Sequence, residues 1–109
     1  ELRDMAIDIC NKYKVTFEMD QIGGFDPVAF DKECLDNIRN SADKFGYSHK
    51  DIVSGAGHDA CWINTVAPSA MVMCPCVDGL SHNEAEEIKP EWASSSTNVM
   101  LHAAIASAT

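Results

Sequence analysis

The chain has 109 residues, of which 46% are hydrophobic and 23% are charged, a composition that predicts one small packed body rather than a disordered segment. Its 17 acidic and 8 basic residues give a formal net charge of −9 at pH 7. That charge disfavours binding to nucleic acid or to anionic membrane surfaces, so we expect neither as a partner. The chain contains no apolar run of the roughly 20 residues that span a bilayer, and no signal-peptide pattern at its start.

The five cysteines are irregularly spaced and odd in number, which argues against a secreted disulfide framework. We therefore expect a reducing compartment and a cytoplasmic location. Cys74-Pro75-Cys76 could be half of a thiolate zinc site, but no second pair of Cys or His stands at a suitable spacing. Reduced cysteines at the end of a strand are the better interpretation.

Residues 2–13 place Leu2, Met5, Ile9 and Tyr13 on one stripe, which predicts an amphipathic helix. Apolar and polar residues then alternate from 15 to 20, which predicts a strand with one wet face. Because the chain begins inside a helical pattern and without Met, we expect it to have been cut from a longer protein. Gly23-Gly24 is the clearest boundary, since paired glycines interrupt regular structure.

Beyond this boundary, Asp26-Pro27 predicts a helix N-terminus, and an apolar stripe from Phe30 to Phe45 predicts a helix that stops at Gly46. The expected elements after it are a strand at 51–53, a glycine-rich turn at 54–57, a helix at 58–66, a strand at 70–74 buried on both faces, a polar loop at 77–87, and a last helix from Pro90 that buries Trp92, Val99, Met100, Ala103 and Ala104. This alternation predicts an α/β layer with mainly parallel strands. Two strands cannot cover such a sheet, so we expect it to continue in further chain.

The first candidate site is the turn that leads into the helix at 58–66. Glycines there let backbone N–H groups approach a ligand, and His58 could donate a hydrogen bond to a carbonyl or an oxyanion. The local pattern also fits a tight strand-to-helix turn with a solvent-facing histidine.

The second candidate is His82, in the loop after the apolar strand, at the edge where open α/β sheets bind ligands. Neutral imidazole is a common zinc ligand, but a catalytic metal needs about three protein ligands, and no paired histidine lies nearby. An ordinary loop histidine is therefore the alternative.

Taken together, these stretches resemble the C-terminal third of the N-carbamoyl-L-amino-acid hydrolases, which belong with allantoate amidohydrolase to the M20 metallopeptidase superfamily. The resemblance covers nearly the whole chain and is carried by Ser54-Gly55-Ala56-Gly57-His58-Asp59-Ala60, Ala67-Pro68, Asp78-Gly79-Leu80-Ser81-His82-Asn83-Glu84, Glu86 and Asn98-Val99-Met100-Leu101-His102-Ala103. Val77 departs from the pattern, because many relatives have a basic residue there, and this puts substrate preference in doubt.

The resemblance implies that residues 25–109 close a three-layer αβα catalytic domain of the zinc-peptidase type. Residues 1–24 would be the last helix and strand of an inserted α+β dimerisation domain. His82 matches the family's last metal ligand, His58 a substrate-contacting histidine, and Gly57 a turn position beside the substrate. The full-length parent would hold two divalent ions, zinc or else Mn, Co or Ni, and would form a homo-oligomer.

The activity so implied is hydrolysis of the carbamoyl amide of N-carbamoyl-L-amino acids or related ureido acids. This chain alone would lack most of the active site, since the other ligands and the catalytic glutamates have no counterpart in it. Two alternatives stay open: an M20 aminoacylase or peptidase, and a stand-alone, non-catalytic domain that dimerises or binds a small ligand. The histidine after Gly57 favours the carbamoylase branch over the peptidases.

Overall fold

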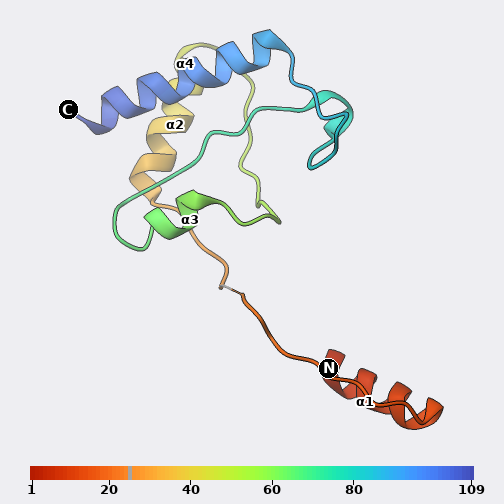
Figure 1. Cartoon of the computed structure of the whole chain (residues 1–109). Helices are drawn as coiled ribbons and strands as arrows, with labels where there is room; N and C mark the ends of the chain where they lie inside the picture. Colours follow the sequence, from red (N-terminus) through yellow and green to blue (C-terminus); the bar gives the residue numbers. More distant parts are fainter. Residues whose placement is uncertain (25) are drawn as a thin grey trace.

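The computed structural model describes residues 1–24 and 26–109. Its elements, in chain order, are α1 (Leu2–Tyr13), α2 (Lys32–Lys44), α3 (Asp59–Ile63), the short 3-10 helix η1 (Val77–Gly79) and α4 (Pro90–Ser107). The segments between them are extended or irregular, and α1 lies at the far end of a long connection from the other helices (Figure 1).

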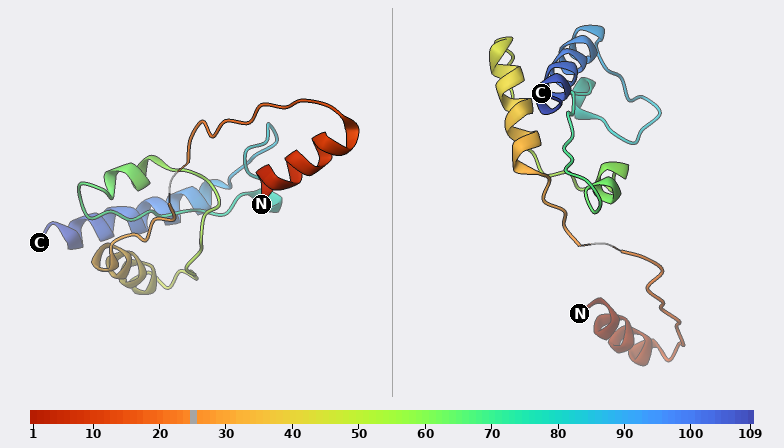
Figure 2. Two further views of the ribbon diagram at one scale, coloured as in Figure 1. Left: turned by 90° about the horizontal axis from the view of Figure 1, so that it is seen from below. Right: turned by 90° about the vertical axis from the view of Figure 1, so that its left-hand side faces the viewer.

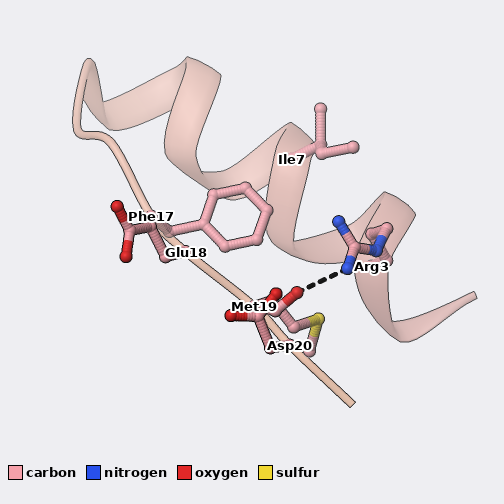
Figure 3. Close-up of a pocket in the computed structure, with 6 residues that line it drawn as sticks. All are labelled: Arg3, Ile7, Phe17, Glu18, Met19 and Asp20. Carbon is pink, nitrogen blue, oxygen red and sulfur yellow. Dashed lines mark hydrogen bonds between the residues drawn. The ribbon is translucent and has the colours of Figure 1, made fainter.

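The first helix confirms the prediction for residues 2–13. It ends where Lys14 adopts a left-handed conformation at φ 54°, and the extended chain then turns back along the helix. The Arg3 guanidinium donates a hydrogen bond to the Met19 carbonyl, and the Phe17 ring points toward α1 (Figure 3). α1 and the extended chain beside it line an open pocket of about 430 Å³. No residue of α1 is buried.

The predicted start of α2 is wrong. The helix begins at Lys32, and its N-cap is Asp31 rather than Asp26. The Asp31 carboxylate accepts the Cys34 N–H at 2.9 Å, and this bond lowers the pKa of Asp31. The Asp31 N–H donates to the Ser69 carbonyl at 3.0 Å, which ties the preceding extended chain to a distant segment. At the other end, Gly46 adopts φ 68° and stops the helix as predicted.

The packed part of the described chain lies between α2 and α4, and no other pair of described helices makes contact. Its buried residues are Ser41, Ala42, Val99 and Ala103. Pro90 opens α4 as predicted, because its fixed φ suits the first helical turn. Met100 and Ala104 contradict the prediction that they lie on the buried side, since both are exposed, Met100 to 57%.

The three predicted strands are not confirmed. In residues 1–24 and 26–109 no strand forms, although 15–20, 51–53 and 70–74 run without helix. Val53 is 99% exposed, and 70–74 is not covered on both faces, since Met73 is 48% exposed and the other four residues are half-buried. A strand exists only through hydrogen bonds to a neighbouring strand, and the described chain supplies no such neighbour. α3 is also shorter than the predicted helix at 58–66.

The shape of the described chain is far from that of a closed domain. Its radius of gyration is 20.0 Å, whereas about 13 Å is expected for a compact chain of this length. Its accessible surface of 8989 Å² exceeds the roughly 5,900 Å² of a folded monomer of this mass. The two further views show the same open arrangement (Figure 2). The exposed apolar side chains therefore lack the cover that a stable domain provides.

We predict that the isolated 109-residue chain self-associates. Ile22 and Val53 are fully exposed, at 101% and 99%, and burying such side chains against a second copy is favourable. Sedimentation velocity over a concentration series should show mass that rises above 11.9 kDa. The matched variant Ile22→Lys/Val53→Lys should associate less. A wild-type chain that stays monomeric at every concentration would contradict this expectation.

No described helix is long and apolar enough to cross a membrane.

Candidate functional site

The turn before α3 places His58 beside a serine. The Ser54 hydroxyl lies 2.7 Å from His58 Nε2, and the same hydroxyl accepts the Ala56 N–H at 3.2 Å. Both side chains are half-buried. His58 is the N-cap residue of α3 in an extended conformation, and its carbonyl accepts the Cys61 N–H at 2.9 Å. Nε2 is thus occupied, which leaves Nδ1 as the ring nitrogen that can bind another group.

Gly57 is exposed and directly precedes His58. Its φ is not positive, unlike the φ of Gly46 and Gly79, which are both 68°. The turn therefore does not need a glycine at 57 for its conformation. What a glycine provides at this position is a backbone without a side chain next to His58.

The loop at 77–87 is closed and locally strained. The Val77 N–H donates to the Glu87 carbonyl at 2.8 Å, so the loop's two ends are joined. Within it, Asp78 and His82 adopt φ values of 54° and 56°, both left-handed. Such conformations are disfavoured for residues other than glycine, and they are concentrated at functional sites.

The carboxylate of Glu86 bridges two parts of this loop. Oε2 accepts the His82 N–H at 2.8 Å, and Oε1 lies 3.5 Å from the Cys76 thiol. A turn lies between His82 and Glu86, in which the Glu86 N–H donates to the Asn83 carbonyl at 2.9 Å. The His82 side chain is exposed, and its ring atoms make no hydrogen bond within the described chain.

His82 fits a metal as one ligand and no more. An exposed imidazole free of protein partners is the donor that zinc and its neighbours prefer. Among the residues that the structure describes, however, no group of three or more His, Cys, Asp or Glu could hold a metal ion. Nor does any hydrogen bond in this part of the chain join His58 to His82.

The cysteines next to this loop are reduced, and one of them contacts Glu86. All five cysteines are free, and Cys74 and Cys76 are half-buried. Burial raises the pKa of the Cys76 thiol, and the nearby Glu86 carboxylate raises it further. Both effects favour the protonated thiol in the metal-free protein. The free, half-buried thiols agree with the interpretation of Cys74-Pro75-Cys76 as reduced cysteines.

A family model for Peptidase family M20/M25/M40 matches residues 3–106. The chain belongs to this family. The resemblance inferred from the two loops is thereby confirmed. Among curated relatives, the N-carbamoyl-L-amino-acid amidohydrolase of Rhizobium meliloti is 52% identical over 103 residues, which cover 94% of this chain and 25% of that protein.

Two solved structures of hydantoinase/carbamoylase family amidases superpose on this chain. A hydantoinase/carbamoylase family amidase from Burkholderia vietnamiensis aligns with a TM-score of 0.92 at 48% identity, over 96% of this chain and 25% of that one. The corresponding amidase from Burkholderia multivorans aligns with a TM-score of 0.81 at 51% identity, over 94% of this chain and 25% of that one. The chain thus spans about a quarter of the length of these relatives.

Sequence reasoning found the two histidines of this M20 segment but missed the residues that contact them. Ser54 and Glu86 each lie four positions from the histidine they bind, outside any helix. The sequence patterns Ser-x-x-x-His and His-x-x-x-Glu are short and common, so neither predicts a side-chain contact outside a helix. The available hint was that both residues belong to the stretches that carry the family resemblance.

Proposed function

We propose that this chain is the C-terminal segment of a metal-dependent amidohydrolase that cleaves the carbamoyl amide of N-carbamoyl-L-amino acids or related ureido acids. The observation that carries the proposal is the 52% identity to an N-carbamoyl-L-amino-acid amidohydrolase over 94% of the chain. The TM-score of 0.92 to a hydantoinase/carbamoylase family amidase supports it. The similarity to these two relatives favours a carbamoyl amidohydrolase over an aminoacylase, a peptidase or a non-catalytic domain.

We assign residues 25–109 to the catalytic αβα domain and residues 1–24 to an inserted dimerisation domain of a homo-oligomeric, cytoplasmic enzyme. The lack of contact between α1 and the other described helices supports a boundary near Gly24, although residue 25 itself lies outside the described residues. The extended segments 51–53 and 70–74 become strands once the remainder of the sheet pairs with them. Free cysteines agree with a reducing compartment.

His82 provides one imidazole ligand to a divalent ion, zinc or else manganese, cobalt or nickel, and the other ligands come from outside this chain. The support is its exposed, unpartnered ring on a strained loop. When bound, such an ion supplies Lewis-acid polarisation of a carbonyl oxygen.

His58 and Gly57 bind the substrate. If the Ser54 hydroxyl donates to Nε2, the neutral ring carries its proton on Nδ1 and can donate it to the substrate carbonyl or to the oxyanion that develops there. The Ala56 N–H occupies a lone pair of the same hydroxyl, which favours this arrangement. Gly57 leaves the adjacent backbone open for close approach.

The direct test is an assay of the complete gene product that contains these residues. We expect hydrolysis of an N-carbamoyl-L-amino acid that chelation abolishes and added divalent metal restores, with much slower turnover of N-acetyl amino acids and dipeptides. The 109-residue chain alone should be inactive. Preferential cleavage of a dipeptide, no hydrolysis of any of these substrates, or activity of the isolated chain, would each overturn the proposal.

A further inference from the structure

We propose that Glu86 is a positioning residue for His82: its carboxylate holds the His82 backbone in the left-handed conformation and so fixes the point from which the imidazole projects. This inference rests on the proposed function of His82 as a metal ligand. It assigns a role to a residue that does not itself bind metal or substrate.

The geometry around the carboxylate is specific to this glutamate. One oxygen accepts the His82 N–H at 2.8 Å, and the other lies 3.5 Å from the Cys76 thiol at the start of the loop. Glu86 therefore connects the residue that precedes the loop to the middle of the loop. The side chains of Glu84 and Glu87 make no hydrogen bond or ion pair within residues 1–24 and 26–109. A nearby carboxylate alone therefore does not account for the bond between Glu86 and the His82 N–H.

His82 needs such a restraint. A histidine at φ 56° occupies a region that L-residues rarely adopt. A hydrogen bond from its N–H to a charged acceptor is of the stronger kind and favours the strained conformation over extended alternatives. The loop's other restraints lie elsewhere: Val77 bonds the Glu87 carbonyl, and Asn83 bonds the Ala85 N–H at 2.9 Å. Without Glu86, the His82 backbone is free to relax.

If the His82 backbone relaxes, the imidazole binds metal less well, because the loop must return to one conformation when the metal binds. Removal of an outer-shell partner typically costs about 10–100-fold in metal affinity. We expect a loss in this range for Glu86→Ala in the complete gene product. Glu86→Gln should lose less affinity than Glu86→Ala, because its amide oxygen can still accept the His82 N–H although without the charge. Glu87→Ala removes a neighbouring carboxylate of equal charge and should change nothing.

Two measurements test this. Zinc affinity is determined by competition with a chromogenic chelator for the wild type, Glu86→Ala, Glu86→Gln and Glu87→Ala. Hydrogen–deuterium exchange on the metal-free proteins then follows the peptide that contains His82, which should exchange faster in Glu86→Ala alone. Equal weakening by Glu86→Ala and Glu86→Gln would show that charge rather than the hydrogen bond matters, and would overturn the inference. So would unchanged zinc affinity or unchanged exchange in Glu86→Ala.

His82→Ala separates this inference from the proposed function. If His82→Ala loses metal while Glu86→Ala binds it as the wild type does, His82 remains a ligand and only the positioning role of Glu86 fails. If His82→Ala keeps its metal, the ligand assignment fails, and the positioning inference fails with it.

Discussion

His82→Ala, in the complete gene product, is expected to lower metal affinity by more than about 100-fold, beyond the loss typical of an outer-shell partner. The exposed imidazole ring makes no hydrogen bond within the described residues, so no protein group competes there with a metal for its nitrogens. Hydrolysis of an N-carbamoyl-L-amino acid should fall with metal content. Both are measured on protein that has been stripped of metal and reloaded at one zinc equivalent per site.

His49→Ala is the matched control for His82→Ala. His49 is also an exposed loop histidine, but its Nε2 lies 3.0 Å from the Asp43 carboxylate, so it already has a surface partner. We expect metal content and hydrolysis to be unchanged in this variant. Equal zinc stoichiometry in His82→Ala and wild type would remove His82 from the site.

His58→Ala is expected to lower kcat/KM by about 10²–10³-fold, the typical cost of losing one donor to a developing oxyanion. Because His58 is bonded to Ser54 and not to His82, metal content should not change. The loss should fall mainly on kcat, since the hydrogen bond strengthens as negative charge develops on the oxygen. Steady-state kinetics and zinc analysis of the same preparation provide both readouts.

Two further variants locate the donor on the ring. His58→Asn retains an N–H at the position of Nδ1 and should recover part of the activity. Ser54→Ala removes the 2.7 Å contact to Nε2 and should cost less than His58→Ala, because the ring remains but its orientation and tautomer are less restricted. A His58→Ala enzyme with unchanged kcat/KM would show that His58 contributes nothing to turnover.

The helices show which parts of this fold a sequence can specify. α1 and the start of α4 follow from local information, namely an apolar stripe and a proline at the first turn. The start of α2 does not, because two aspartates can each cap it. The choice falls on Asp31, whose N–H is also bonded to the distant Ser69 carbonyl.

The predicted strands show what local sequence does not determine. The apolar run at 70–74 and the alternation at 15–20 carry strand patterns, but pairing needs partners, and none lies in the described chain. The strand pattern alone therefore does not produce a strand in the described residues. The exposed Val53 and the large accessible surface follow from the same cause.

The candidate site also has features that the sequence predicts and features that only the structure shows. His58 and His82 could be singled out because histidines in loops beside glycines are chemically informative. The left-handed backbone of His82 and its bond to Glu86 could not, since both depend on how the closed loop folds in three dimensions. The sequence thus predicts the candidate groups, whereas the structure shows which residues contact them.

The most direct test of the account is a zinc-edge anomalous difference map from crystals of the complete, metal-loaded gene product. We predict an anomalous peak about 2.0–2.1 Å from a ring nitrogen of His82, with the remaining ligands contributed by residues outside this chain. A fully occupied metal site with the His82 ring pointing away from it would contradict the account.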